Sequence, residues 1–150
     1  MYTRIRMMVC YMYPIFPNKI TQWKLANNLD ACRWLYNRLL QDLSEAEEKG
    51  LKLKTYDTQN MIPSLKLENP KLNQVYSKVL QMVNYTLWSN IKGLSASKKN
   101  GRKISHIRFK GYGRYNTLNY NQSEFKVDQD HSILHLSKIG DVKIKLYRKN

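Results

Sequence analysis

A long run of apolar residues at helical spacing limits the folds open to this chain more than any other feature. Residues 21–49 repeat apolar side chains at close to 3.6-residue intervals, which predicts one long amphipathic helix. The stripe consists of Leu25, Leu29, Cys32, Tyr36, Leu39 and Leu43. Trp34, Leu35 and Leu40 widen it. We therefore expect this helix to contact more than one neighbour.

Local signals bound this helix and predict two more. Asn18 or Thr21 is a suitable N-cap, and Gly50 is a suitable C-cap. A short helix is expected at residues 57–67, with Pro63 limiting its regularity. The Asn69-Pro70 pair favours a third helix over residues 71–92, because proline suits the first turn.

Alternating patterns at both ends of the chain predict strands. Residues 2–13 alternate until Pro14 and Pro17, where we expect the strand to end. Later strands are expected at residues 115–122, 125–127, 132–136 and 141–147, with turns at residues 128–130 and 140–141. In the last strand, Val142, Ile144 and Leu146 are expected to face the core.

The first strand needs partners, and the late strands are the only candidates. The sequence therefore predicts an α+β fold built on a small antiparallel β-barrel. Its first strand lies in residues 1–17 and its remaining strands in residues 108–150. A helical insertion of about three helices, residues 18–94, and a basic linker, residues 95–107, separate them.

The charge balance favours a polyanionic partner. The formal net charge is +15, with 42% hydrophobic residues and 25% charged residues, as expected for a globular chain. The net charge is +2 over residues 1–50, +6 over residues 51–100 and +7 over residues 101–150. This asymmetry favours a nucleic-acid surface over general solubility.

The segment Lys92–Tyr120 concentrates this charge. It holds eight basic residues and no acidic one, and aromatic residues and glycines lie among them. Cations that neutralise phosphates, beside rings that stack on bases, suit a nucleic-acid contact. The predicted phosphate contacts are Lys98, Lys99, Arg102, Lys103, Arg108, Lys110 and Arg114, and the predicted stacking residues are Phe109, Tyr112 and Tyr115. A solvated basic loop is the alternative.

Other sites find little support in the sequence. No apolar run is long enough to span a membrane, and the N-terminus lacks the cleavage site of a signal peptide. Cys10 and Cys32 are isolated, which is consistent with a reducing cytoplasm. The three histidines have no metal-ligand spacing, and no converging carboxylates or nucleophile motif occur. We expect no catalytic site, metal or cofactor on this chain.

Five segments together resemble the TnpB (OrfB) proteins of bacterial and archaeal insertion sequences. DACRWLYNRLL (Asp30–Leu40) is similar to their "G/A-C-R-hydrophobic-x-Y-N-x-x-L" helix, and Tyr13–Leu29 to the entry into it. Val75–Lys92 resembles the helix with their "LQ" pair. Ile107–Tyr120 resembles their "P-R-F-K … Y-x-S-hydrophobic-x-Y" segment, and Leu134–Arg148 their "L-x-L-P-K-I-G-x-V-K-hydrophobic" strand pair. The segments follow the family's order and span nearly the whole chain.

The sequence departs from the family pattern at several positions. Ile107 replaces the usual proline, Thr117 a serine and Ser137 a proline. The family continues into a RuvC-like nuclease domain with an Asp/Glu/Asp metal site and a zinc-binding cysteine cluster. This chain ends at Asn150, before any of these features.

The resemblance implies a specific role. Full-length members are RNA-guided DNA endonucleases, whose N-terminal half is a wedge barrel interrupted by a helical recognition domain. That half binds a transposon-derived guide RNA and reads a short target-adjacent DNA motif, while base pairing supplies most of the specificity. The resemblance therefore implies a nucleic-acid-binding part without the nuclease site. Gln22, Lys24 and Asn28, taken as exposed, are the candidates for DNA contact.

Three other interpretations stay open at this point. The chain could be a DNA-binding repressor that occupies a target without cutting it, which RNA-independent binding to duplex DNA would favour. It could support catalysis in trans with a separately encoded RuvC-like nuclease half, which an adjacent reading frame would favour. It could also be a non-functional pseudogene fragment, which poor expression and exposed apolar surface would support.

Overall fold

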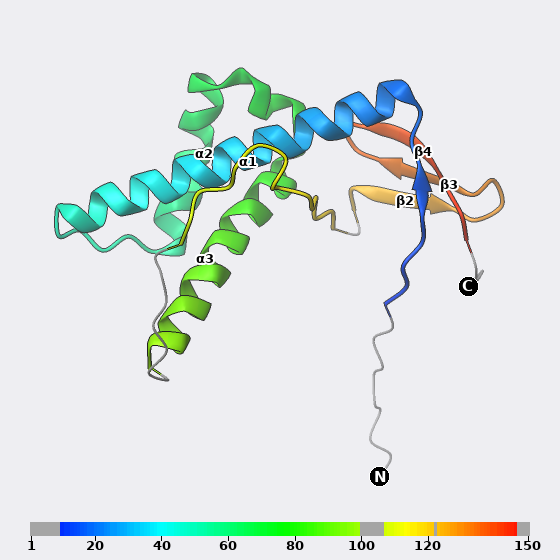
Figure 1. Ribbon diagram of the computed structural model, residues 1–150. Coiled ribbons are helices and arrows are strands. Elements are labelled where there is room, and N and C mark those ends of the chain that lie inside the picture. Colours follow the sequence, from blue (N-terminus) through cyan, green and yellow to red (C-terminus); the bar gives the residue numbers. More distant parts are fainter. Residues whose placement is uncertain (1–9, 100–106, 122, 147–150) are drawn as a thin grey trace, which may run out of the picture.

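The fold combines a helical subdomain with a small antiparallel sheet (Figure 1). The computed structural model describes residues 10–99, 107–121 and 123–146. In these residues the elements are β1 (Ile15–Phe16), α1 (Lys19–Glu48), α2 (Thr55–Glu68), a 3₁₀ helix η1 (Pro70–Gln74), α3 (Ser77–Lys99), β2 (Phe125–Asp128), β3 (Ile133–Leu136) and β4 (Gly140–Ile144). The prediction of an α+β chain with helices between the first and the later strands is confirmed.

Helix α1 is the longest element, with 30 residues, and both of its ends are capped as the sequence predicts. At the start, the Asn18 carboxamide oxygen accepts a hydrogen bond from the Thr21 N–H at 2.8 Å. At the end, Gly50 has a φ of 75°, and the Leu51 N–H donates to the Ala46 carbonyl at 2.8 Å. The glycine thus allows a turn that satisfies a carbonyl of the last helical turn.

The third helix differs from its prediction at both ends. Residues 70–74 form η1, Val75 is extended, and α3 begins only at Ser77. The break lets both Leu72 and Val75 bury their side chains, at 0% and 2% exposed. At the other end, α3 continues to Lys99, so residues 95–99 of the expected linker are helical. No proline or glycine interrupts residues 94–99, which is why the helix can continue there.

The sheet has the strand order β1-β4-β3-β2, and all of its pairs are antiparallel (Figure 1). Leu134 lies opposite Val142, which is 1% exposed, and Phe125 lies opposite Leu136. One face of the sheet is therefore apolar, as the alternation predicts. In the described residues the sheet is open, with β1 and β2 at its two edges, rather than the closed barrel that we expected.

Two of the expected strands differ in the structure. Most of the strand expected at residues 2–13 lies outside the described residues, and its described part, residues 10–13, is not a strand. The paired residues Ile15 and Phe16 instead lie between the two prolines. Proline is tolerated there because β1 is an edge strand, and the Pro14 carbonyl still accepts a hydrogen bond from the Lys145 N–H at 3.0 Å. Residues 115–121 are not a strand.

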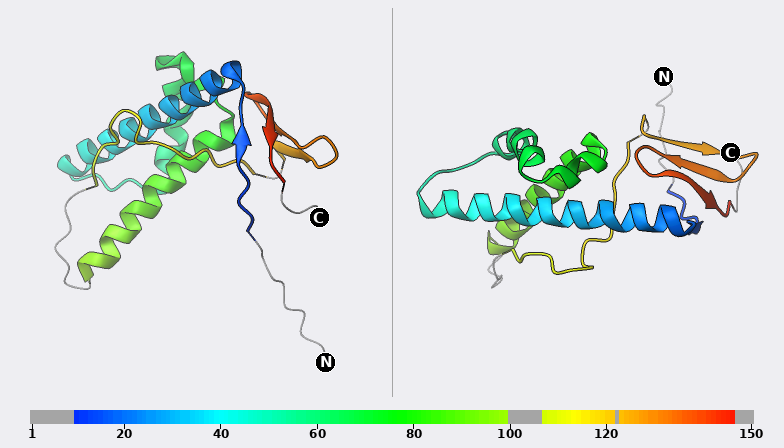
Figure 2. Two further views of the ribbon diagram at one scale, coloured as in Figure 1. Left: turned by 45° about the vertical axis from the view of Figure 1, so that its right-hand side comes forward. Right: turned by 90° about the horizontal axis from the view of Figure 1, so that it is seen from above.

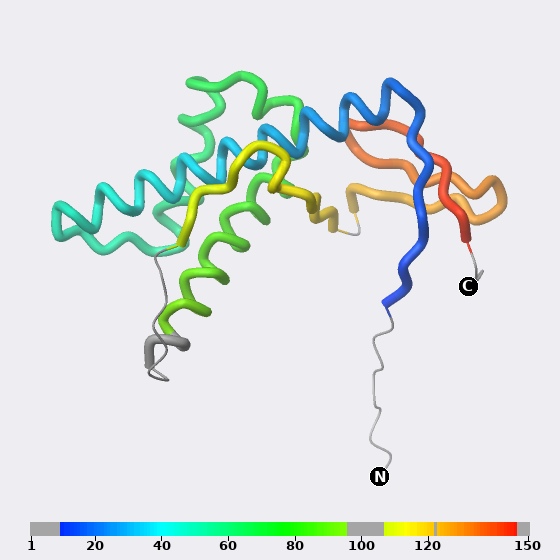
Figure 3. Tube along the Cα trace, in the orientation of Figure 1, coloured from blue at the N-terminus to red at the C-terminus, as the bar shows by residue number. Residues whose placement is uncertain are grey.

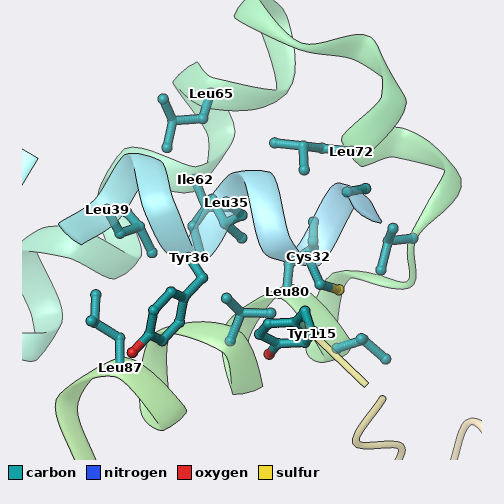
Figure 4. Packing of buried hydrophobic residues seen from close by; sticks show 14 of the residues in the cluster. Cys32, Leu35, Tyr36, Leu39, Ile62, Leu65, Leu72, Leu80, Leu87 and Tyr115 are labelled. Atoms are coloured by element: carbon teal, nitrogen blue, oxygen red, sulfur yellow. The ribbon is translucent and has the colours of Figure 1, made fainter. Parts of the chain in front are cut away.

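The main core lies between α1, α2, η1 and α3 (Figure 4). Leu35, Leu39 and Cys32 of α1 are fully buried, as are Leu80 and Leu87 of α3. Seen from above, α2 lies on one side of α1, whereas residues 107–121 begin on the other side and then cross α1 toward the sheet (Figure 2, right). The N-terminal half of α1 extends beyond this core to the sheet (Figure 1). One helix thus belongs to both parts of the fold.

A buried polar network joins α2 to α3. The Thr58 hydroxyl is within 2.6 Å of the Asn84 carboxamide oxygen, and it accepts a hydrogen bond from the Trp88 indole N–H at 2.8 Å. The Asn84 amide N–H donates to the Thr55 carbonyl at 3.1 Å. Thr58 and Asn84 are both 0% exposed, so these bonds replace those that water would make.

We expect Thr58→Val to lower the free energy of unfolding by about 1–3 kcal/mol, because the Trp88 N–H and the Asn84 oxygen lose a partner in a buried site. Urea unfolding followed by circular dichroism measures the change. Thr117→Val, at an exposed position, is the matched control and should change little. Equal effects of the two substitutions would contradict the role of the network.

Glu124 connects the chain before β2 to the start of α3. Its carboxylate is buried and accepts hydrogen bonds from the Ser123 hydroxyl and from the Asn121 N–H at 3.2 Å, and the Lys78 ammonium lies 3.6 Å away. Burial alone would raise the pKa of Glu124. The hydrogen bonds from Ser123, Tyr76 and Asn121, with the Lys78 charge, outweigh burial and hold the pKa below its ordinary value of 4.5.

This lowered pKa predicts a pH-dependent contribution to stability. The folded state favours the charged carboxylate, so the contribution is present above pH 4.5 and is lost as the pH falls through the lowered value. Glu124→Gln should therefore destabilise the protein at neutral pH, and the difference from the wild type should shrink below pH 4.5. Thermal melts across pH measure this difference. Glu48→Gln, at an exposed position, should give none, and a constant gap for Glu124→Gln at all pH values would disprove the assignment.

Candidate nucleic-acid interface

Residues 107–121 run alongside α1 from the helical subdomain toward the sheet (Figure 3, yellow). They include the Arg108-Phe109-Lys110 sequence and the turn at Gly113, where φ is 73° and the Arg114 N–H donates to the Gly111 carbonyl at 3.0 Å. We call these residues the basic segment. Its backbone is irregular, so the backbone N–H and C=O groups that water does not reach need side-chain partners.

Asn37 of α1 fixes the backbone of the basic segment at Lys110. Its carboxamide oxygen accepts a hydrogen bond from the Lys110 N–H at 2.8 Å, and its amide N–H donates to the Lys110 carbonyl at 2.9 Å. The side chain of Asn37 thus pairs with both backbone groups of one residue, as a neighbouring strand would. The Arg33 guanidinium adds a longer bond of 3.4 Å to the same carbonyl.

Two cations pack on aromatic rings where α1 meets the basic segment. The Lys110 ammonium lies 5.5 Å from the centroid of the buried Tyr36 ring. The Arg33 guanidinium lies 6.0 Å from the centroid of the exposed Tyr112 ring. Contacts of this kind contribute roughly 0.5–1 kcal/mol each at exposed sites. They hold Lys110 and Tyr112 near α1.

A surface pocket of about 510 Å³ lies where the basic segment faces α1 and α3. Arg108, Phe109, Lys110, Gly111 and Arg114 line it from the basic segment. Tyr36 lines it from α1, and Asn90, Gly93 and Leu94 line it from α3. The pocket therefore brings together three parts of the chain that lie far apart in sequence.

Among the described residues, the cations of this pocket have no carboxylate partner. In the helical subdomain, Arg33 pairs with Asp30, and Arg38 pairs with Asp42 and Glu68. No carboxylate of the described residues pairs with Arg108, Lys110 or Arg114. Arg108 and Arg114 are exposed, so their charges can meet an anion from solvent.

The structure separates the three predicted stacking residues. The Phe109 side chain is 59% exposed and that of Tyr112 is 87% exposed, so both rings can receive a base. Tyr115 is only 8% exposed and packs in the helical core with its ring centroid 6.1 Å from that of Tyr36 (Figure 4). Burial raises the pKa of its hydroxyl well above the usual range. The expectation that Tyr115 stacks on a nucleic acid is therefore corrected, because its ring is part of the core.

The remaining candidates differ in their surroundings. Gln22 is exposed, and its amide N–H donates to the Pro17 carbonyl at 3.2 Å, whereas Lys24 is half-buried. Asn28 is 2% exposed, so the expectation that it is exposed for DNA contact is wrong. Its position on the buried face of α1 explains this, since Cys32 and Leu35 follow on that face. The side chains of Lys98, Lys99, Arg102 and Lys103 lie outside what the structure describes.

The described histidines each pair with a carboxylate. The His131 Nδ1 lies 2.8 Å from an Asp128 oxygen within the β2–β3 turn, and the His135 Nδ1 pairs with Asp141 across the sheet. Within the described ranges, no three His, Cys, Asp or Glu side chains come together in a group that could hold a metal ion. In the same ranges, no helix has the length and apolar character that a membrane span requires.

The structure adds Arg33, Tyr36, Asn37 and Asn90 to the interface, which sequence reasoning did not select. Arg33 and Asn37 are four residues apart on α1, so they share a face, and this spacing was the available signal. Asn90 has no such signal, because only the packing of α3 against α1 brings it to Tyr36. Comparison of the sequence with protein-family models and with curated proteins finds no match.

We expect Asn37→Ala to release the backbone of the basic segment at Lys110. Amide hydrogen exchange should speed up at the Lys110 N–H, because its acceptor is lost, while exchange in the α3 core should stay slow. Mass spectrometry or NMR measures these rates. Asn116→Ala, an exposed asparagine in the same segment, is the control. Unchanged exchange at Lys110 in Asn37→Ala would show that the two hydrogen bonds do not hold the segment.

Proposed function

We propose that this chain is the nucleic-acid-binding N-terminal part of a TnpB-like protein of an insertion sequence. In this role it binds guide RNA and target-adjacent DNA in the cytoplasm, and these 150 residues contain no nuclease site of their own. The resemblance stated above is the source of the family, and the geometry supports the binding role.

The observation that carries the proposal is the docking of the basic segment on α1. The segments Asp30–Leu40 and Ile107–Tyr120 resemble separate parts of the family pattern, and here they contact each other through Asn37 and Lys110. Arg108 and Arg114, which pair with no carboxylate in the described part of the chain, line the same pocket as the exposed Phe109. Phosphate neutralisation with base stacking is the chemistry of single-stranded nucleic-acid binding.

A second line of support is the order of elements. One short strand precedes the helical subdomain, and β4, the last strand, pairs with it. A helical recognition insertion in a wedge barrel has this arrangement. We propose that the sheet described here is the part of such a barrel that contains β1 and β4, with β2 at the edge where the barrel would close.

The whole-protein role requires partners beyond this chain. We propose RNA from the end of the element as the guide, duplex DNA as the target, and a RuvC-like nuclease part, on the same or a separate chain, as the unit that cuts. A metal belongs to that nuclease part in this proposal, so this chain needs no cofactor for binding.

A charge-matched pair of double variants tests the proposal. Arg108→Ala with Lys110→Ala should weaken RNA binding more than Lys98→Ala with Lys99→Ala, although both lower the charge equally, because only the first pair lies on the docked segment. Fluorescence anisotropy with RNA transcribed from the DNA that adjoins the reading frame measures the affinities over a salt series. Each lost phosphate contact should reduce the log–log salt slope by about 0.7.

The same experiment contains the contrary outcomes. Absent or salt-independent RNA binding by the wild type would disprove the proposal. Equal losses of RNA affinity in the two double variants would show that the basic segment contributes only non-specific positive charge. Tight binding of duplex DNA without RNA would favour a repressor-like role instead.

A further inference from the structure

The pocket between the basic segment and α3 contains an exposed polar side chain, Asn90, that is bonded to a buried tyrosine hydroxyl. The Tyr36 hydroxyl accepts a hydrogen bond from the Asn90 amide N–H at 2.9 Å, and Figure 4 shows this hydroxyl directed toward α3. Asn90 is exposed and keeps its carboxamide oxygen and a second N–H for a ligand, whereas Tyr36 is 1% exposed and holds Asn90 in place from the core. Within the described residues neither side chain has another hydrogen-bond partner.

The walls of the pocket suit a flat, negatively charged ligand. The Phe109 ring is 59% exposed, and Arg108 and Arg114, which have no carboxylate partner in the described ranges, also line the pocket. Gly93 of α3 leaves one wall without a side chain, and a Cβ placed there would meet no atom within 4 Å. A larger side chain at this position would therefore occupy the open space beside Gly93.

The size of the pocket suits a single nucleotide. Its volume of about 510 Å³ is within the range of small-molecule sites, roughly 300–1,000 Å³. Bases inside a helix are stacked and paired, so only an unpaired base can enter such a pocket and present its edge. A donor beside an acceptor, as on the Asn90 carboxamide, can distinguish bases by their edges.

We propose that this pocket binds the base of one unpaired nucleotide, with Phe109 stacking on the base, Asn90 bonding to its edge while the Tyr36 hydroxyl orients Asn90, and Arg108 and Arg114 holding adjacent phosphates. This inference rests on the proposed nucleic-acid binding and adds base discrimination to it. Asn90 is the specificity residue in this view and Tyr36 its positioning residue, whereas the arginines supply affinity for any sequence.

Comparing the affinity of the chain for oligonucleotides of different bases tests the proposal directly. Labelled oligoadenylate, oligouridylate and oligocytidylate of equal length are titrated with the full chain, and their dissociation constants should differ by at least about fivefold. Three variants should reduce this difference to less than about twofold: Tyr36→Phe, Asn90→Ala and Gly93→Leu. Tyr36→Phe keeps the ring in the core, and Gly93→Leu fills the pocket while favouring the helix.

Matched controls separate the pocket from general effects. Tyr56→Phe, Asn73→Ala and Ser95→Leu make the same kinds of change at exposed positions outside the pocket, and they should retain the preference. Thermal melts check that every variant is folded. Phe109→Ala should weaken binding to all three oligonucleotides by about tenfold, because stacking does not depend on base identity.

The outcomes distinguish this inference from the proposed function. A base preference that the three pocket variants abolish and the controls retain supports the pocket. Salt-dependent binding without base preference, or a preference unchanged in Gly93→Leu, overturns the pocket and leaves nucleic-acid binding in place. No binding of any oligonucleotide at low salt overturns both.

Discussion

The apolar stripe of α1 is the constraint on which the rest of the structure depends, because one helix packs in the helical core and also reaches the sheet. Its 30 residues span about 45 Å. Leu35 and Leu39 pack with α2 and α3, while Leu25 and Leu29 lie near Leu134 of the sheet. The sheet and the helical subdomain cannot separate without exposing part of the stripe to water. The positions of Asn37 and Arg33 relative to the sheet are fixed by the same helix.

The sequence predicted the elements whose signals are local. The caps of α1 at Asn18 and Gly50 depend on neighbouring residues, and the buried side of β4 depends on strict alternation. The break before α3 could not be read in this way. Pro70 favours a helix start, but burial of both Leu72 and Val75 against α1 and α2 requires the chain to turn between them. The stabilisation from burying these two side chains arises only once the helices have packed, so no local sequence pattern predicts it.

The candidate site shows the same division between local and tertiary information. The charge and aromatic content of residues 92–120 identified the segment, but the alternation within residues 115–122 suggested a strand. An extended chain that packs on a helix has the same pattern, because one side of it is buried, as Tyr115 is here. The Asn37 side chain makes the two backbone hydrogen bonds at Lys110 that a neighbouring strand would make. Alternation of apolar and polar residues indicates that one side of an extended chain is buried, but it does not show whether a strand or a helix covers that side. Tyr115 was therefore assigned to the surface when it belongs to the core.

The arginines of the chain fall into two groups, those that pair with carboxylates within the fold and those that can bind an external anion. Arg33 and Arg38 face carboxylates, so they add little to the external field near α1. Arg108 and Arg114 face no carboxylate among the described residues, so their charges remain available to an external anion. The Asn37 bonds to Lys110 order the backbone between these two arginines before any ligand arrives. An ordered segment loses less conformational entropy on binding, so these bonds strengthen the attraction to an anion.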